Sequence, residues 1–299
     1  MQVFTVRPLS GRMLNVRPLG LIAGEGVFPM LVARGARRAG RKVICAALSG
    51  SAWAELRNEC DVFRWVGVAR LGQWIRLLRN SGCDEAIMVG RVTKSQMYNR
   101  WRYFQYLPDF RTIKLWFTDL RRDKRPAAIL SMIARELQHE GITLIDSTLY
   151  TPESLADVGV MTQHRQPTEQ QRADAEFGWS LCQQISRLDI GQAIAVMDKD
   201  VIAVEALEGT NAMIERAGRL CKTGGWTLIK VANTKQDMRM DVPTIGTTTI
   251  EKLAAARAGC IVLEAGKTVI LEKQKVLELA ERHKIAIVGY EGKSETPSL

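Results

Sequence analysis

Apolar and polar residues follow two patterns along the first half of the chain. Short apolar runs predict buried strands, and the stretches between them repeat apolar residues every three or four positions, as amphipathic helices do. The predicted strands are residues 19–23, 43–48, 62–66, 85–89 and 142–145. The predicted helices are residues 29–38, 52–58, 69–80 and 126–140. Strands that alternate with helices across short turns predict an α/β domain built on a doubly wound parallel sheet.

The second half of the chain has a different pattern. A long helix over residues 168–188 is followed by two β-branched runs, 193–197 and 201–206, and the intervening Asp198-Lys199-Asp200 predicts a hairpin. Further helices are predicted over residues 210–220, 248–258 and 273–282, and further strands over 227–231, 261–263, 268–271 and 285–288. A hairpin among helices leaves both a mixed α/β and an α+β domain open.

The length of 299 residues fits two domains of roughly 150 residues each. A polar, turn-rich stretch separates the two patterns and predicts a boundary between them. We therefore expect an N-terminal extension (1–18), an N-terminal domain (19–148), a linker (149–166) and a C-terminal domain (167–299).

Composition and charge exclude several classes of protein. No apolar run approaches the roughly 20 residues of a membrane-spanning helix, and the first 18 residues lack the apolar core of a signal peptide. The six cysteines form no C-x-x-C pair and the three histidines stand alone, which predicts reduced thiols in a cytoplasmic protein and argues against a zinc site. The net charge of +10 predicts an acidic partner, which charge alone leaves open among nucleic acid, an anionic lipid surface and a phosphorylated substrate.

Most of this charge lies in residues 91–125, which hold ten Lys and Arg against three Asp, a net +7. Eight of the 19 aromatic residues of the chain lie there too. Cations interleaved with aromatic rings can stack on single-stranded bases, or can sit at an anionic membrane interface. A solvated basic rim around a few core aromatics is the third interpretation.

Two segments that join a predicted strand to a predicted helix could contribute to a binding site. Gly24-Glu25-Gly26, between a predicted strand and helix, resembles the start of a phosphate-binding loop, although the third glycine of G-x-G-x-x-G is replaced, so a plain tight turn stays open. The segment Glu205–Met213 joins a strand to a helix, where open sheets bind ligands, and Thr210 could equally serve as a helix cap.

The segment Lys235–Gly246 carries the most suggestive pattern of charges. In an extended conformation Asp237, Arg239 and Asp241 lie on one face. Two carboxylates that flank a guanidinium suit a site for Mg²⁺ and phosphate together, and a salt-bridged outer strand face is the alternative.

Four segments, in this order and spacing, resemble a known family. They are Leu21–Pro29, Arg187–Gln192, Val204–Met213 and Asp241–Gly246, and the resemblance covers nearly all of residues 19–290. The chain resembles the LpxI-type UDP-2,3-diacylglucosamine pyrophosphatases of Gram-negative lipid A synthesis. This resemblance implies a Rossmann-like N-terminal domain, a family-specific C-terminal domain, and hydrolysis of UDP-2,3-diacylglucosamine to lipid X and UMP by attack of water on the α-phosphorus.

The resemblance also assigns roles to residues. Asp241 matches the essential aspartate of the D-x-P-x-x-G motif, and Asp237 and Arg239 match its neighbours, so these three are the expected catalytic residues, with Asp237 and Asp241 binding Mg²⁺ or Mn²⁺. The expected substrate-binding residues are Gly24, Gly26, Glu208, Thr210, Asn211, Lys230, Gln236, Thr244 and Gly246.

The expected partners follow from the same resemblance. They are the UDP-linked diacylated glucosamine and the anionic inner-membrane surface, with a homodimer plausible and nucleic acid not expected. The chain departs from the pattern at Asn211, where aspartate is expected, and at Asn233-Thr234, where Lys-Pro is expected. The competing hypothesis is a nucleic-acid-binding protein that works through residues 91–125.

Overall fold

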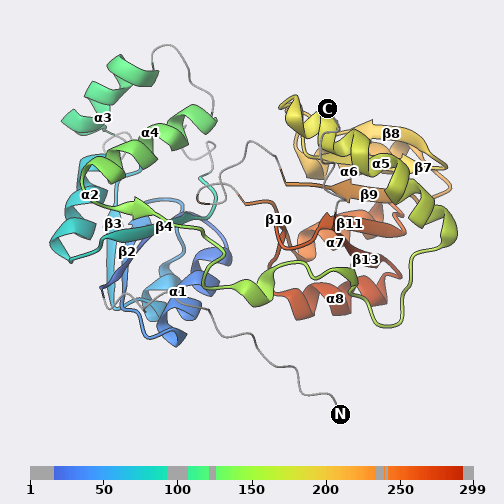
Figure 1. The fold of residues 1–299 in the computed structure, drawn as a ribbon, viewed down its shortest axis with the longest axis horizontal. Coiled ribbons are helices and arrows are strands. Elements are labelled where there is room, and N and C mark those ends of the chain that lie inside the picture. Colours follow the sequence, from blue (N-terminus) through green and yellow to red (C-terminus); the bar gives the residue numbers. More distant parts are fainter. Residues whose placement is uncertain (1–16, 93–106, 121–125, 233–238, 240–241, 292–299) are drawn as a thin grey trace, which may run out of the picture. The chain divides into compact units, whose positions relative to one another are not determined.

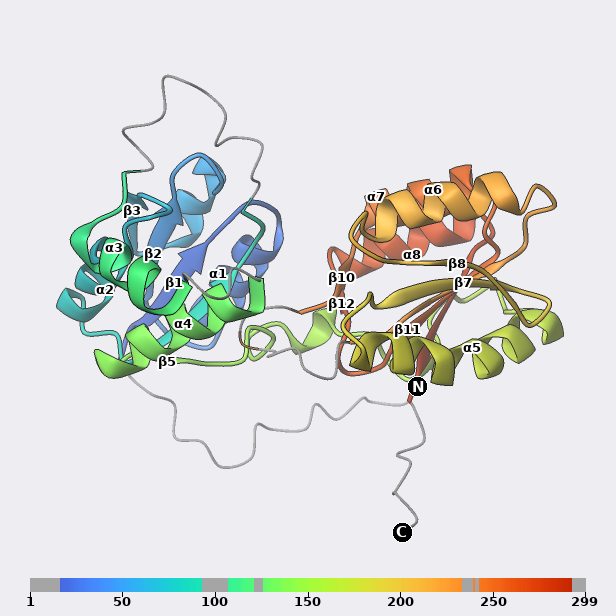
Figure 2. The ribbon, with the colours of Figure 1, turned by 90° about the horizontal axis from the view of Figure 1, so that it is seen from above.

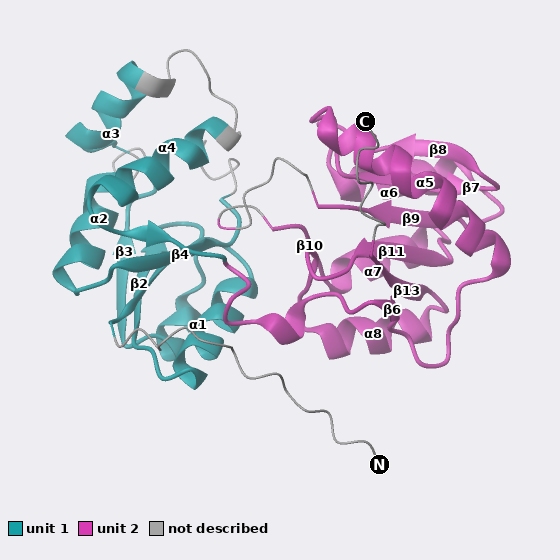
Figure 3. Cartoon of the chain, in the orientation of Figure 1, with its two compact units in different colours: residues 1–146 teal, residues 147–299 magenta. Residues whose placement is uncertain are grey.

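The computed structural model describes residues 17–92, 107–120, 126–232, 239 and 242–291 (Figure 1). The chain divides into two compact units, residues 1–146 and 147–299, coloured separately in Figure 3.

Unit 1 is built on a five-stranded sheet in which all strands are parallel, in the order β3-β2-β1-β4-β5. The strands are β1 (Leu19–Ala23), β2 (Val43–Leu48), β3 (Val62–Val66), β4 (Glu85–Val89) and β5 (Thr143–Leu144). β1 and β2 are buried along their whole length, as strands covered on both faces are. The predicted parallel sheet is thus confirmed, and its order reverses between β1 and β4, which is where such sheets bind ligands.

The helices of unit 1 connect these strands. They are α1 (Phe28–Arg38), the 3₁₀ helix η1 (Ala54–Glu59), α2 (Leu71–Asn80), α3 (Phe110–Leu115) with its π-helical continuation η4 (Trp116–Leu120), and α4 (Pro126–His139). The chain moves one way along the sheet from β1 to β2 and the other way from β3 to β4. Right-handed connections therefore place α1 and α2 on opposite faces, as Figure 2 shows.

Unit 2 is built on a six-stranded mixed sheet in the order β6-β13-β11-β9-β7-β8. The strands are β6 (Gly159–Val160), β7 (Ala193–Met197), β8 (Asp200–Val204), β9 (Thr227–Lys230), β11 (Cys260–Glu264) and β13 (Ala286–Tyr290), and β10 (Thr244–Ile245) pairs separately with β12 (Val269–Ile270). β9, β11 and β13 run parallel, whereas β7 is antiparallel to β8 and β9. The mixed α/β alternative is therefore the correct one.

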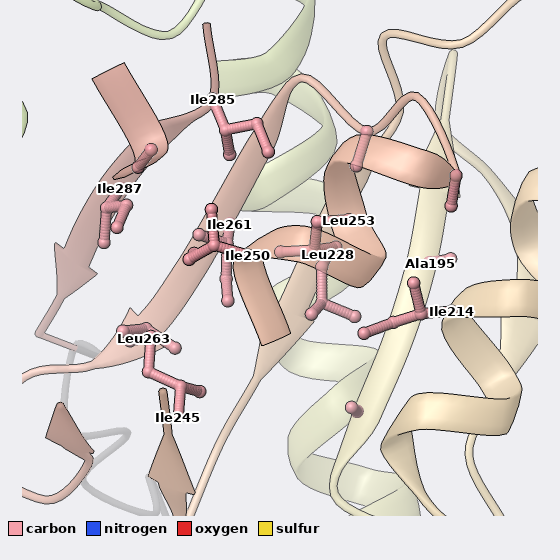
Figure 4. Close-up of a cluster of buried hydrophobic side chains, with 14 of the residues drawn as sticks. Ala195, Ile214, Leu228, Ile245, Ile250, Leu253, Ile261, Leu263, Ile285 and Ile287 are labelled. Carbon is pink, nitrogen blue, oxygen red and sulfur yellow. The ribbon is translucent and has the colours of Figure 1, made fainter. Parts of the chain in front are cut away.

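Helices cover both faces of this sheet. They are α5 (Glu169–Arg187), α6 (Thr210–Leu220), α7 (Thr247–Ala255) and α8 (Lys273–Arg282), and unit 2 also has a 3₁₀ turn, η5 (Pro152–Ser154). Figure 2 shows α6, α7 and α8 on one face and α5 on the other. Side chains such as Ile214, Ile250 and Ile261 form the larger core between the sheet and the three helices (Figure 4). Trp226 is fully buried there and its indole Nε1 donates to the Ala256 carbonyl at 3.0 Å.

The predicted hairpin is confirmed, and its geometry explains the sequence. Asp198 and Lys199 form the two-residue turn between β7 and β8, and both have positive φ angles of 53° and 60°. Such a turn matches the right-handed twist of the two strands, and aspartate is among the residues that tolerate positive φ.

Residues 149–166, which we expected to be a linker, belong instead to unit 2. Gly159 and Val160 form β6, which pairs antiparallel with β13, and Ala156 is buried in the larger core. A strand of two residues has no hydrophobic periodicity, so the pattern of this segment resembles that of a loop.

The cysteines are free thiols, as the sequence predicts, and four of the six are buried. Burial raises the pKa of Cys83, Cys182 and Cys260 to about 12, so these thiols are protonated at neutral pH and are not nucleophiles. Within the described residues, no helix is long and apolar enough to cross a membrane.

Candidate functional site

Two motif segments of the second half, Arg187–Gln192 and Val204–Met213, meet at one edge of the sheet of unit 2. Lys230, at the end of β9, is the register partner of Ala193 at the start of β7 and of Leu263 near the end of β11. Val204, at the end of β8, pairs with Ile194 at the same edge. Because β7 runs opposite to its neighbours, the segments that precede β7 and that follow β8, β9 and β11 all emerge there.

A buried polar network occupies this edge. The Nζ of Lys230 donates to the hydroxyl of Thr210 at 2.9 Å, and that hydroxyl donates to the Oε1 of Glu205 at 2.7 Å. Lys230 is only 5% exposed and Glu205 only 6%. Burying a charged group is costly unless it is hydrogen-bonded, so a cation held in this place is a fixed feature of the edge.

The segment that precedes β7 holds the carboxylate of Glu205 in place. The backbone N–H of Gln192 donates to the Oε2 of Glu205 at 3.3 Å, and the backbone N–H of Glu205 donates to the Ala193 carbonyl at 2.9 Å. A Cβ atom on Gly191 would lie 2.0 Å from the backbone oxygen of Glu205. Residue 191 must therefore be glycine, because there is no space for a Cβ atom.

Replacing Gly191 by alanine is expected to displace Glu205, because the atom that the new methyl group meets belongs to the backbone. We expect a loss of about 1–3 kcal/mol in the free energy of unfolding, typical of overpacking, together with lowered activity. Urea denaturation measures the first effect. Gly246→Ala, whose Cβ has room, is the control for the unfolding measurement alone, because residue 246 is itself an expected substrate-binding residue. Wild-type stability of Gly191→Ala would contradict the steric argument.

Glu264, at the end of β11, fixes the start of the segment that carries the expected catalytic residues. Its Oε2 accepts from the backbone N–H of Ala232 at 2.8 Å, and its Oε1 pairs with the Nζ of Lys267 at 2.6 Å. Ala232 is followed directly by Asn233-Thr234, Gln236, Asp237 and Asp241, all of which lie outside the described residues. Arg239 is described and exposed.

The predicted substrate residues after β8 differ in their environments. Thr210 belongs to the buried network, whereas Glu208 and Asn211 are exposed. A hydrogen bond from its own backbone N–H and the guanidinium of Arg216, 2.6 Å away, lower the pKa of Glu208. Glu208 is therefore ionised at neutral pH and is not a proton donor.

Two helices begin at this edge. α6 begins at Thr210 after β8, and α7 begins at Thr247, one residue after Gly246 of the D-x-P-x-x-G motif. Thr244 is exposed at the start of β10. The unpaired N–H groups of a helix N-terminus attract anions, so the edge combines a buried cation with two positive helix ends.

The glycine turn of unit 1 lies where its sheet reverses order. The backbone N–H of Gly24 donates to the Val89 carbonyl and that of Glu25 to the Arg91 carbonyl, both at 2.8 Å. A Cβ on Gly24 would lie 2.7 Å from the Arg91 oxygen, and Gly26 has a φ of 115°. Both glycines are thus needed for the turn itself, which is the plain structural interpretation, and the turn is placed where a ligand could bind.

The described carboxylates of this edge do not form a metal centre. No group of three or more Asp, Glu, His or Cys side chains suited to a metal occurs in the described part of the chain. Glu205 and Glu264 each accept hydrogen bonds from N–H or O–H groups of the protein. Asp237 and Asp241, the expected metal ligands, lie outside the described residues.

Comparison with known proteins matches both halves of the chain. The model of the LpxI N-terminal domain matches residues 18–154, and that of the LpxI C-terminal domain matches residues 157–288. The chain belongs to the LpxI family. It is 30% identical over 283 residues to the UDP-2,3-diacylglucosamine pyrophosphatase LpxI of Caulobacter vibrioides, an alignment that covers 92% of this chain and 98% of that protein.

Sequence reasoning overlooked part of the network in this LpxI-family chain. Glu205, Gln192 and Glu264 were not predicted as site residues, although the first two lie in the motif segments that carry the family resemblance. The motif Arg187–Gln192 appeared to be only a helix end and turn. The structure shows that its last two residues hold Glu205, which a one-dimensional pattern cannot reveal.

Proposed function

We propose that this protein is a hydrolase that cleaves the pyrophosphate of UDP-2,3-diacylglucosamine to lipid X and UMP in lipid A biosynthesis. The observation that carries the proposal is the nearly end-to-end match to the pyrophosphatase of Caulobacter vibrioides. The buried Lys230 and the two helix N-termini at one edge of unit 2 support it, because a pyrophosphate needs positive charge around it.

The proposed roles follow from position in the chain and in the sheet. Asp241 and Asp237 would act on water and bind Mg²⁺ or Mn²⁺, which neutralises phosphate charge and activates water when bound. Arg239 and Lys230 would bind the phosphates. The other proposed substrate contacts are those of Gln236, Glu208, Thr210, Asn211, Thr244 and Gly246, together with Gly24 and Gly26 at the switch point of the parallel sheet, where nucleotides bind in Rossmann-like folds.

We further propose that the enzyme works in the cytoplasm at the inner surface of the inner membrane, as a peripheral protein and a homodimer. The two acyl chains of the proposed substrate anchor it in a bilayer, so an enzyme that acts on it must reach that surface.

Removal of divalent cations tests the metal dependence. Purified protein treated with EDTA is expected to lose hydrolysis of UDP-2,3-diacylglucosamine, and added Mg²⁺ or Mn²⁺ is expected to restore it. Release of UMP and lipid X, followed by mass spectrometry, is the measurement. UDP-glucosamine without acyl chains serves as the matched substrate control. Full activity in EDTA would contradict the proposed metal dependence. Absence of activity with either cation would contradict the proposed reaction.

A further inference from the structure

Two cysteine thiols meet in unit 1, where the chain enters β3. Cys45 lies in β2 and is fully buried, whereas Cys60, at the end of η1, is half-buried. The two strands are parallel neighbours, and the backbone N–H of Asp61 donates to the Val43 carbonyl at 3.0 Å, so the chain before β3 lies against β2. The thiols of Cys45 and Cys60 are hydrogen-bonded to each other. Two thiols in contact are placed to form a disulfide.

Cys60 lies in the wall of a surface cavity of about 420 Å³, which Arg57, Asp61, Phe63 and Arg64 also line. This volume is within the range of roughly 300–1,000 Å³ that small-molecule sites occupy. The guanidinium of Arg57 lies 5.3 Å from the centroid of the Phe63 ring, and the Nη1 of Arg64 donates to the Phe63 carbonyl at 3.0 Å. Both cations are thus held at the wall that contains Cys60.

The wall of this cavity carries a net positive charge. Its two guanidinium groups outnumber its one carboxylate, that of Asp61, whose Oδ2 accepts from the backbone N–H of Val43 at 2.8 Å. The adjacent carboxylate of Glu59 forms an ion pair with Arg34 at 2.8 Å. A cavity with this charge attracts a small molecule that is negatively charged. A half-exposed sulfur beside cations is typical of cysteines that react with such molecules.

The two thiols differ in access and in acidity. The hydrogen bond with Cys60, together with burial, raises the pKa of Cys45 well above its ordinary value, so this thiol stays protonated at neutral pH. Cys45 is also 0% exposed. A protonated, buried thiol is a poor nucleophile, and therefore Cys60 must react first. Once the sulfur of Cys60 is bonded to another sulfur, Cys45 is the thiol beside it.

We propose that Cys60 is a site of reversible modification by a small anionic disulfide such as glutathione disulfide, and that Cys45 resolves the adduct. The sulfur of Cys60 attacks one sulfur of the reagent, whose S–S bond breaks, and the first glutathione leaves with the proton of Cys60. The sulfur of Cys45 then attacks that of Cys60, and the second glutathione leaves with the proton of Cys45. The protein loses two electrons and two protons, and the reagent is reduced to two thiols. This site goes beyond the proposed hydrolysis and does not depend on it.

Peptide mapping tests the modification, because trypsin separates the two cysteines into peptides 43–57 and 58–64. The folded full-length protein is treated with glutathione disulfide, quenched with N-ethylmaleimide in denaturant and digested. The wild type is expected to yield the two peptides joined by a disulfide, which dithiothreitol breaks. Cys45→Ala is expected to stop at the glutathione adduct on peptide 58–64, and Cys60→Ala is expected to leave the thiol of Cys45 free. Cys221→Ala, at the half-buried cysteine of unit 2, is the matched control and should behave as the wild type does.

A second measurement tests the charge of the reagent. The double variant Arg57→Gln/Arg64→Gln, which changes two exposed side chains, is expected to react about tenfold more slowly with glutathione disulfide and at the wild-type rate with the neutral 2-hydroxyethyl disulfide. Equal rates with glutathione disulfide in this variant and in the wild type would overturn the anionic reagent. Wild-type protein in which Cys60 stays unmodified, in which Cys221 reacts as fast, or in which the adduct persists without joining the two peptides would overturn the proposal.

Discussion

Asp241→Asn is expected to reduce hydrolysis of UDP-2,3-diacylglucosamine by several orders of magnitude. The substitution keeps the size of the side chain and removes the negative charge that a metal ion or an activated water requires. The residue lies in the segment that follows β9 and Ala232, whose backbone Glu264 fixes at the edge where Lys230 is buried. Steady-state release of UMP measures the effect, which should appear in kcat more than in KM.

The matched control for this variant is Asp198→Asn. Asp198 is exposed in the hairpin turn at the opposite edge of the same sheet, and asparagine also tolerates its positive φ. This control should keep full activity, and both variants should unfold at the wild-type urea concentration. Near-normal activity of Asp241→Asn would show that the chemistry is carried by other residues.

Lys230→Met is expected to lower kcat/KM by about 100-fold or more, the usual effect of losing a preorganised charge at a reaction centre. Methionine has a similar shape without the charge, so the buried space stays filled. The free energy of unfolding should fall by only about 1–2 kcal/mol, because Glu205 keeps its hydrogen bonds from Thr210 and from the backbone of Gln192.

Two further variants distinguish a catalytic cation from a structural one. Lys222→Met removes an exposed lysine of the same unit and should leave activity and stability unchanged. Glu205→Gln should also lower activity, and its effect should not add to that of Lys230→Met, because Thr210 joins the two side chains in one network. A wild-type kcat/KM in Lys230→Met would show that the charge of Lys230 takes no part in the reaction.

The strands and helices with strong periodicity could be predicted from the sequence. β1, β2, β3 and β4 were predicted with the bounds that they have, because each is a mainly apolar run between turn residues. The two-residue strands β6 and β10 were missed, since so short a strand has no period. α3 and η4 were also missed, because their apolar residues face outward and cations interrupt them, so the segment had only the composition of a basic stretch.

The site could be predicted in part. Lys230 and Thr210 were predicted from the family resemblance, and the structure places them 2.9 Å apart. The carboxylate that completes the network, that of Glu205, was not predicted. Its environment depends on Gly191 and Gln192, which precede β7, and β7 is antiparallel to the strand that Glu205 follows. Sequence spacing does not show that β7 is antiparallel to both of its neighbours, and this direction is what brings the segments to one edge.

Hydrolysis of UDP-2,3-diacylglucosamine by the purified protein in H₂¹⁸O, with both products examined by mass spectrometry, tests the proposed reaction most directly. Attack of water on the α-phosphorus predicts one ¹⁸O atom in UMP and none in lipid X, and Asp241→Asn is expected to form both products several orders of magnitude more slowly. Label in lipid X would contradict the proposed site of attack. Absence of both products in the presence of Mg²⁺ or Mn²⁺ would contradict the function itself.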